Sequence, residues 1–384
     1  MREICGKLTS WIFIVAAHIH SIATLVPPLR YPQEQIRDFM LEALPGDERA
    51  RRLLRRMYSQ SAIGFRHSVL GDLAGPVAEP FFTRDAAGHW HTPTTGQRNA
   101  RYAREAPALF VNVARAALTQ SGFVPAEVTH VITVSCTGFF NPGPDFHVVR
   151  GLGLAENTRR VNIGFMGCYA LFPALAAAEA FCRADPRAVV LVVCVELCSL
   201  HIQLKAEHDA MLGGCLFGDG AGALVMSARE PRAGHTALAI RSLGSVLLPD
   251  SAAAMAWSIG DDGFDIALSS YVPDLIAAHI QPAVAGWLAS QSLTTAAVTR
   301  WAVHPGGRAI LDKTAAALAL PPDAVQVSRD ALHEVGNLSS ATLCFVLERL
   351  LRAGPAQSDA TICALAFGPG LTLEMALFSP VVGA

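Results

Sequence analysis

The fold class is decided by one stretch, Val161-Asn162-Ile163-Gly164-Phe165-Met166-Gly167-Cys168-Tyr169-Ala170, in which an apolar run leads into an alanine-rich segment. Its glycines let the backbone turn sharply, so we predict a strand that passes into a helix near Cys168. A second apolar run, Ala188-Val189-Val190-Leu191-Val192-Val193-Cys194, follows and is rich in β-branched residues. Short, wholly apolar runs between helical segments are typical of parallel strands covered on both faces. The sequence therefore predicts an α/β fold.

The order of elements around this stretch is repeated in the second half of the chain. We predict a helix over 105–121 and a strand over 131–134 in the first half, and a helix over 274–291, a strand over 301–303, a helix over 338–352 and a strand over 362–366 in the second. Cys168 and Asn337 occupy nearly the same place in the two repeats. Such internal repetition predicts two similar halves, 1–235 and 236–384. A pseudo-twofold relation between the halves would bring Cys168 and Asn337 face to face.

The composition narrows the class of protein. The chain has 384 residues, 52% of them hydrophobic and 16% charged, which suits a large compact body with buried layers. A net charge of -2 without a long run of Lys or Arg argues against nucleic-acid binding. One basic cluster, formed by Arg51, Arg52, Arg55 and Arg56, is either a solvated helix face or a contact for an anionic ligand.

Cysteine and histidine positions argue against disulfides and metal sites. Nine cysteines are spread over the chain without a Cys-x-x-Cys pair, as expected in a reducing cytoplasm. His89-Trp90-His91 lacks a neighbouring ligand, so we predict no metal there. The apolar run over 11–17 is too short to cross a bilayer and is either a first strand, which we favour, or part of a signal peptide. We expect no membrane span elsewhere.

Cys168 lies where nucleophilic cysteines are found, at the start of a predicted helix. The free N–H groups and partial positive charge of a helix N-terminus favour the thiolate and can lower a cysteine pKa from about 8.5 to about 3.5–7.5. A thiolate is the form that attacks a thioester carbonyl. The alternative is a buried structural cysteine.

Two further polar residues end a strand and open a helix in the second half. His304 precedes Pro305-Gly306-Gly307 and lies at the carboxyl end of a predicted strand, where α/β enzymes place their chemistry. There an imidazole can pair with a thiolate or donate to an oxyanion, although a lone histidine can also be packed in a core. Asn337 precedes the apolar run over 343–351 and is either a helix N-cap or an amide donor to a thioester carbonyl.

Together these patterns resemble the type III polyketide synthases, the chalcone synthase-like family within the thiolase fold. The resemblance runs from about Ile19 to Phe378, nearly the whole chain. The family's cysteine, histidine and asparagine segments are similar to Gly164–Leu171, Trp301–Gly307 and Gly336–Thr342. Its gatekeeper loop is similar to Leu216–Ala221, and its C-terminal loop to Phe367–Gly370. Single segments of this kind occur by chance, but five in this order rarely would.

The resemblance implies a fold and a reaction. The fold is a five-layered α/β/α/β/α body of two duplicated halves, and the protein is a cytoplasmic homodimer. Cys168 accepts an acyl group from an acyl-CoA starter, while His304 and Asn337 hold the carbonyl of malonyl-CoA and stabilise the enolate that forms when CO2 leaves. The enolate then attacks the acyl thioester and lengthens the chain. Coenzyme A thioesters are the substrates, and no metal or organic cofactor is implied.

The resemblance also assigns residues to substrate binding. Phe217 matches the gatekeeper phenylalanine, and Gly307 closes the histidine segment. Arg56 is the one basic residue that matches those set against coenzyme A phosphates in plant members. Ile266 stands where plant members have a second phenylalanine, which opens space, and His201 lies near a position that controls pocket volume.

Two departures from the plant members bear on the product. Cys136 falls where plant members have threonine, and it is either a second pocket thiol or a small lining residue, which we favour. Asn141-Pro142-Gly143-Pro144-Asp145 resembles the bacterial alkylresorcinol and alkylpyrone synthases more than the plant enzymes. This favours a long fatty acyl starter and an alkylpyrone or resorcinol-type product.

Two rival interpretations share the fold. A ketoacyl synthase III of fatty-acid synthesis also uses Cys, His and Asn, but its histidine motif usually reads His-Gln-Ala-Asn rather than His304-Pro305-Gly306-Gly307. A non-catalytic binding or scaffolding relative would be expected to have lost one of the three residues, and all three are present here.

Overall fold

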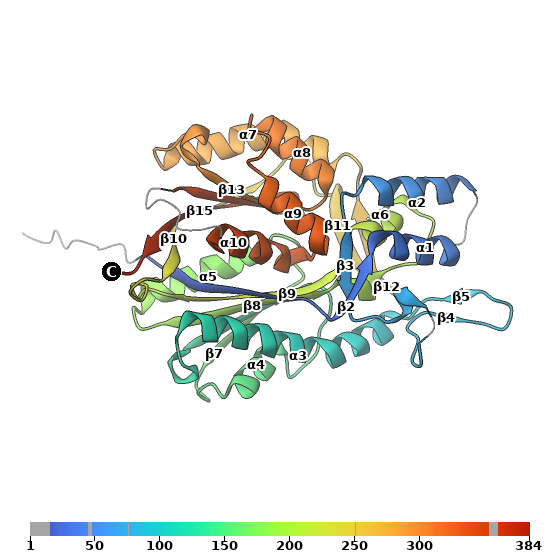
Figure 1. Ribbon diagram of the computed structural model, residues 1–384, viewed down its shortest axis with the longest axis horizontal. Coiled ribbons are helices and arrows are strands. Elements are labelled where there is room, and N and C mark those ends of the chain that lie inside the picture. The colour runs from blue at the N-terminus through green and yellow to red at the C-terminus, as the bar shows by residue number, and fades with distance from the viewer. Residues whose placement is uncertain (1–15, 45–47, 76, 250, 353–359) are drawn as a thin grey trace, which may run out of the picture.

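The computed structural model describes residues 16–44, 48–75, 77–249, 251–352 and 360–384 (Figure 1). The first described strand is β1 (His18–Leu25), and most of the apolar run over 11–17 lies outside the described residues. Figure 1 shows five stacked layers, in which two layers of strands alternate with three layers of helices. The five-layered arrangement predicted from the sequence is confirmed.

One continuous sheet of nine strands runs through both strand layers, in the order β13-β14-β15-β10-β1-β9-β8-β6-β7. Its first-half strands are β1, β6 (His130–Ser135), β7 (Arg159–Gly164), β8 (Val189–Leu197) and β9 (Asp219–Ser227). Its second-half strands are β10 (Thr236–Leu247), β13 (Arg300–Val303), β14 (Ile362–Gly368) and β15 (Thr372–Val382). The two sets meet where β1 pairs with β10 through His18 opposite Ala239 and Ile19 opposite Leu238.

The duplication predicted from the sequence appears in the order and direction of the strands. In the first half β1 and β8 flank β9 antiparallel, and β6 continues parallel to β8. In the second half β10 and β14 flank β15 antiparallel, and β13 continues parallel to β14. The first half carries one more strand, β7, parallel to β6, to which no strand in the described part of the second half corresponds.

Helices cover the sheet in matching pairs. The outer layers hold α3 (Thr95–Ser121) and α4 (Pro144–Leu152) on one side, and α7 (Val272–Ser290) and α8 (Arg308–Ala317) on the other (Figure 1). Between the strand layers lie α5 (Leu171–Ala184) and α10 (Thr342–Arg352), whose apolar side chains form one buried cluster with both halves of the sheet. Helices that are apolar nearly all round are expected in such a central position. Their N-termini carry the segments of Cys168 and Asn337.

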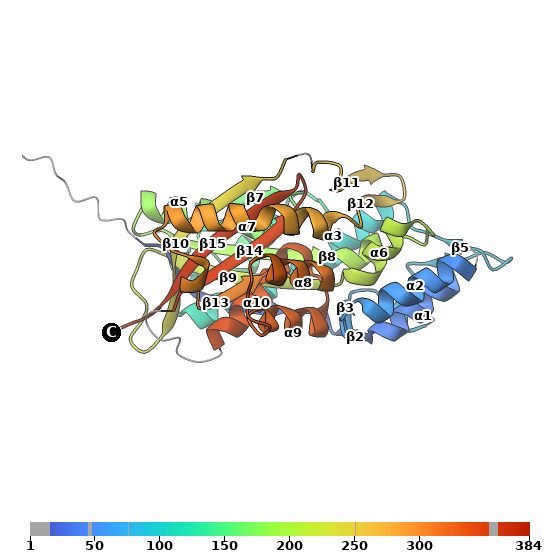
Figure 2. The same cartoon turned by 90° about the horizontal axis from the view of Figure 1, so that it is seen from above.

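Several of the remaining elements gather at one end of the layers. Figures 1 and 2 both show α1, α2 and α6 together with β11 and β12 at this end. The bounds are α1 (Gln33–Ala43), α2 (Glu48–Gln60), α6 (His208–Leu216), α9 (Gln326–Val335), β2 (Leu29–Pro32), β3 (Phe65–Ser68), β4 (Thr83–Arg84), β5 (Trp90–His91), β11 (Met255–Gly260) and β12 (Gly263–Leu268), with short 3₁₀ helices at η1 (Asp72–Ala74), η2 (Pro125–Glu127), η3 (Cys198–His201), η4 (Thr295–Ala297) and η5 (Ser339–Ala341).

Two helix predictions need correction. The helix predicted over 105–121 begins earlier, at Thr95, because Thr94 and Gln97 form a capping box in which each side chain accepts a hydrogen bond from the other's backbone N–H. The helix predicted over 338–352 starts as η5 and becomes α-helical at Thr342. Neither change moves Cys168 or Asn337 away from the centre of the fold.

Candidate active site

The residues that the sequence assigned to the site line two adjoining cavities of about 540 and 450 Å³. Cys168, Phe217 and Ile266 line both cavities, together with Trp257 and His208. Cys136 and His201 line the larger cavity, and His304, Asn337, Gly307 and Arg56 line the smaller one. All nine predicted site residues therefore line these two cavities, and Cys168 borders both.

Cys168 lies in a turn between β7 and α5. Phe165 and Gly167 both have positive φ angles, 59° and 86°, and Ala170 donates its N–H to the carbonyl of Gly167 at 3.0 Å. A Cβ on residue 167 would approach the Trp257 ring to 2.5 Å, so only glycine fits this turn. The turn delays the first α-helical residue to Leu171 and directs Cys168 into the cavity.

The environment of Cys168 corrects one expectation from the sequence. The surrounding protein removes water from the thiol and raises its pKa to about 11, and the negative charge of Glu196 acts in the same direction. Hydrogen bonds from Ser339 and Asn337 to the sulfur lower the pKa but do not offset the burial. The predicted lowering of the pKa by a helix N-terminus is therefore wrong, since α5 starts only at Leu171.

His304 is a buried imidazole with free hydrogen-bonding capacity. It follows the last residue of β13, is 1% exposed, and is fixed by its backbone N–H, which donates to the carbonyl of Leu365 at 2.8 Å. Neither ring nitrogen has a partner within the described structure. Buried polar atoms are rarely left unpaired unless a ligand or water completes them. Burial lowers the pKa of His304 to about 3, so the ring is neutral and one nitrogen carries a proton to donate.

Asn337 combines the two roles that the sequence left open. Its Oδ1 accepts the backbone N–H of Ser339 at 2.8 Å, which stabilises the turn before η5 as a cap would. Its Nδ2 donates to the carbonyl of Gly306 at 3.2 Å, and Asn337 lies close enough to the Cys168 thiol to lower the pKa of that thiol. Because Oδ1 is held by a backbone donor, the amide can present only its N–H side to the cavity.

A buried carboxyl group that the sequence analysis missed organises the larger cavity. Glu196 on β8 is 0% exposed, and burial raises its pKa. Its oxygens accept from the backbone N–H of Cys136 at 3.0 Å, from the Thr137 hydroxyl at 2.9 Å and from the Ser340 hydroxyl at 2.5 Å, and the Cys136 thiol lies 3.3 Å from Oε1. The sequence signal that could have revealed Glu196 is that it is a charged residue within the apolar run Val192–Leu197. With its thiol donating to Glu196 and its pKa raised by burial, Cys136 fits a lining residue better than a second nucleophile.

Aromatic rings shape the far side of the larger cavity. The His201 ring stacks on Phe264 with centroids 4.1 Å apart, and its Nε2 lies 2.8 Å from the carbonyl of Thr137. Burial lowers the pKa of His201 to about 4, so this wall is neutral. Trp257 on β11, also missed, packs edge-on against Phe165 at 5.3 Å and borders both cavities. No local sequence pattern marks it as a cavity residue.

The outer end of the smaller cavity carries positive charge. Arg56 on α2 and Arg308 at the start of α8 line it, and both side chains are solvent-exposed. The Arg56 guanidinium lies 3.4 Å from Gln60 Oε1, and the Arg308 guanidinium forms a 3.4 Å ion pair with Asp312. An anionic group of a ligand that enters here would meet two guanidinium groups.

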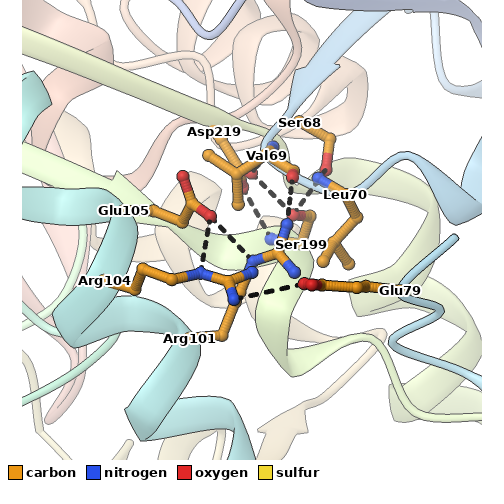
Figure 3. A network of polar contacts seen from close by, with 9 residues as sticks. All are labelled: Ser68, Val69, Leu70, Glu79, Arg101, Arg104, Glu105, Ser199 and Asp219. Atoms are coloured by element: carbon orange, nitrogen blue, oxygen red, sulfur yellow. Dashed lines mark hydrogen bonds and ion pairs between the residues drawn. The ribbon is translucent and has the colours of Figure 1, made fainter.

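The loop that carries Phe217 is anchored by a buried polar network (Figure 3). Asp219, 0% exposed, accepts from the backbone N–H of Ser199 at 2.7 Å, from the Ser199 hydroxyl at 2.6 Å and from the backbone N–H of Val69 at 2.8 Å. Burial raises the pKa of Asp219 to about 6. Arg101 on α3 donates to the carbonyl of Val69 at 3.1 Å, which links the network to the outer helix layer.

The neutral burial of His304 predicts acid sensitivity of the fold. In the unfolded chain histidine protonates near pH 6.5, whereas in the fold His304 stays neutral down to about pH 3, so the unfolded state binds more protons between these values and stability falls as the pH falls. Between about pH 7.5 and pH 5 this costs about 2 kcal/mol. Denaturant unfolding at both pH values should show the wild type losing about 2 kcal/mol more than His304→Gln, which cannot titrate. Equal losses would contradict the buried neutral state.

Within the described residues the structure contains neither a group of at least three His, Cys, Asp or Glu side chains that could hold a metal ion nor a helix long and apolar enough to cross a membrane. His89 and His91 instead both lie beside Asp85, with nitrogen–oxygen distances of 3.1 and 3.7 Å, on the exposed β4–β5 hairpin.

Comparison with known proteins covers nearly the whole chain. Residues 14–230 match the N-terminal domain of chalcone and stilbene synthases, and residues 240–382 match their C-terminal domain. The alpha-pyrone synthesis polyketide synthase-like Pks18 of Mycobacterium tuberculosis is 32% identical over 367 residues, which cover 94% of this chain and 91% of that protein. The 1,3,6,8-tetrahydroxynaphthalene synthase of Streptomyces peucetius is 30% identical over 366 residues, covering 94% and 92%.

Solved structures agree with this likeness. The polyketide synthase PKS-I of the brown alga Ectocarpus siliculosus superposes with a TM-score of 0.88 at 28% identity, over 95% of this chain and 98% of that one. The C-terminal type III polyketide synthase domain of Steely1 from Dictyostelium superposes with a TM-score of 0.86 at 25% identity, over 96% and 100%.

Proposed function

The chain belongs to the chalcone and stilbene synthase family, the type III polyketide synthases, and from that premise we propose that it extends a long-chain acyl-CoA starter with malonyl-CoA and releases an alkylpyrone or resorcinol-type product. The protein is a type III polyketide synthase, an acyltransferase that acts on coenzyme A thioesters without a cofactor. The starter, the product and the role of each residue are the proposal.

The observation that carries the residue roles is the single cavity shared by the Cys168 thiol, the unpartnered His304 ring and the Asn337 amide. Sγ of Cys168 attacks the carbonyl of the acyl-CoA starter, a C–S bond forms, and the coenzyme A thiol leaves with the proton of Cys168. The first half, 1–235, thus supplies the nucleophile. The second half, 236–384, supplies His304 and Asn337.

The two donors act on the malonyl thioester. His304 and Asn337 donate N–H groups to its carbonyl oxygen, so that when the carboxylate leaves as CO2 the electron pair of the broken C–C bond is held as an enolate. The enolate carbon attacks the acyl carbonyl on Cys168 and displaces the sulfur. Neutral donors suit this step, because the negative charge appears only as the reaction proceeds.

The starter assignment is supported by the shape of the larger cavity. Its volume of about 540 Å³ lies within the range of small-molecule sites, and its lining includes Ile202, Phe264 and Ile266 together with Cys168. Ile266 leaves room where a phenylalanine would fill the space. The outer end is lined by exposed polar residues, among them Lys205 and Asp265, which form a 3.3 Å ion pair. An alkyl tail suits the apolar residues beside Cys168, and we take this as support for a long-chain starter.

The starter is tested with a panel of acyl-CoA esters from about six to about eighteen carbons and radiolabelled malonyl-CoA. We expect the wild type to prefer long chains, and Ile266→Phe to shift the ratio of kcat/KM for long over short starters by about 10-fold toward short ones. Ile259→Phe is the matched control, because Ile259 is 60% exposed on β11 and outside both cavities. A preference for malonyl or aromatic starters would reject the long-chain assignment. Activity with malonyl on acyl carrier protein alone would indicate a ketoacyl synthase instead.

We also propose that the protein is a homodimer, as the resemblance implies, and that it works in the cytoplasm, as its cysteine usage indicates. In support, β7, one of the two edge strands of the described sheet, has an unpaired edge, and Phe139 and Phe146, which precede it in the sequence, are exposed. Light scattering should give twice the chain mass of 40.7 kDa.

A further inference from the structure

Arg66 is a charged side chain in the interior of the protein. It lies on β3 and is 2% exposed, and it takes part in no ion pair within the described residues. Burying a guanidinium away from carboxylates costs free energy unless hydrogen bonds satisfy it. Its partners are Gly214 O at 2.6 Å, Phe217 O at 2.8 Å, Gln33 Oε1 at 2.9 Å and the Tyr58 hydroxyl at 3.4 Å.

These contacts place the charge at the C-terminal end of α6. The last carbonyls of a helix lack partners within the helix and carry a partial negative charge, which a guanidinium satisfies. Gly214 O and Phe217 O accept from the same nitrogen of Arg66, so they are drawn toward one point. The ending of α6, and with it the path of the chain at Phe217, depends on this side chain.

The same chain ending pairs with the Asn337 segment. The backbone N–H of Asn337 donates to Leu216 O at 3.0 Å, and the N–H of Gly218 donates to Asn337 O at 2.9 Å. The aliphatic stem of Arg66 lies against this segment, because a Cβ on Gly336 would meet its Cγ at 3.0 Å. Arg66 thus contacts both chain segments that meet at the isolated β-bridge between Phe217 and Asn337.

We propose that Arg66 is a positioning residue for the decarboxylation step: without reaching the substrate, it holds the Phe217 and Asn337 backbones in register so that the Asn337 amide meets the malonyl carbonyl. This rests on the role of Asn337 given under the proposed function. Lysine at this position keeps the charge but cannot span Gly214 O, Phe217 O and Gln33 Oε1 from fixed directions, since it lacks the planar fork of arginine.

The test separates the two half-reactions in Arg66→Lys. Misplacing a catalytic group by about 1 Å can lower a rate by about 10²-fold. The rate of malonyl-CoA decarboxylation, divided by the number of Cys168 sites that a starter can acylate, should therefore fall by about 10- to 100-fold. The burst of coenzyme A released when a starter acylates Cys168 should keep its amplitude and rate. A merely structural role would lower both in proportion to the folded fraction. Arg98→Lys is the matched control, since Arg98 is also fully buried and donates to backbone carbonyls, those of Pro93, Leu200 and Ile202, away from Asn337.

A double-mutant cycle decides whether Arg66 acts through Asn337. In an Asn337→Ala background Arg66→Lys should lower decarboxylation less than about threefold further, because the group being positioned is gone. Additive losses would overturn the proposal, as would normal decarboxylation by folded Arg66→Lys. If Asn337→Ala alone leaves decarboxylation intact, the proposed role of Asn337 fails instead. Should Arg66→Lys not fold, Gln33→Leu removes the acceptor of Arg66 Nε and should give the same selective loss.

Discussion

Replacing Cys168 by alanine is expected to lower polyketide formation by about 10³-fold or more while malonyl-CoA decarboxylation continues within about tenfold of the wild-type rate. The acyl chain is carried on Sγ of Cys168, so without the sulfur the enolate has no acyl group held beside it to attack. His304 and Asn337 remain, and with them the donors for decarboxylation. Radiolabelled malonyl-CoA with a long-chain starter measures product, and released labelled CO2 measures decarboxylation in the same tube.

The control is a second thiol in the same cavity. Cys136→Ala should keep product formation within about tenfold, because the Cys136 thiol donates to Glu196. Equal losses in the two variants would revive Cys136 as a second nucleophile. Full product formation by Cys168→Ala would remove Cys168 from the mechanism.

Replacing His304 by alanine should lower the rate of malonyl-CoA decarboxylation by about 10²–10³-fold, the usual effect of removing one donor to a developing oxyanion. Both ring nitrogens are free in the cavity, so the loss comes from the transition state rather than from a broken internal contact. Acylation of Cys168 by a starter should persist, since the ring forms no hydrogen bond to the thiol. Quenched-flow measurement of CO2 release and of coenzyme A release separates the two steps.

His333→Ala serves as the control for His304→Ala, because His333 on α9 is exposed and lines neither cavity. Decarboxylation by this variant should stay within about twofold of the wild type. If His304→Ala decarboxylates normally and fails only in acylation, then His304 serves the nucleophile and not the malonyl carbonyl.

The centre of the site could be predicted from sequence because its three residues carry local signals. Cys168 follows two glycines at a strand end, His304 precedes Pro-Gly-Gly, and Asn337 precedes an apolar helix. Each signal reports only its own few residues. The internal repeat added that two of these segments open equivalent helices, and the structure places both helices in the central layer, where they share one buried cluster.

The supporting residues could not be predicted because their partners are far away in the chain. Glu196 binds Cys136 and Ser340, and Arg66 binds the carbonyls of Gly214 and Phe217, so neither contact leaves a local pattern. The prediction of a lowered pKa for Cys168 was wrong for a similar reason. A helix N-terminus is visible in sequence, whereas the removal of water that raises the pKa of Cys168 depends on the whole surrounding fold.

The division of roles between the oxygen and the nitrogen of the Asn337 amide has an evolutionary consequence. Its oxygen serves the fold and its nitrogen faces the thiol and the cavity. Aspartate, one base change away, would still accept the N–H of Ser339 but would offer no N–H to a substrate. A gene with that change would encode a chain that no longer condenses and that also lacks the Nδ2 hydrogen bond to Gly306 O. Descendants of such a gene would keep the architecture and be free to acquire another use for the cavity.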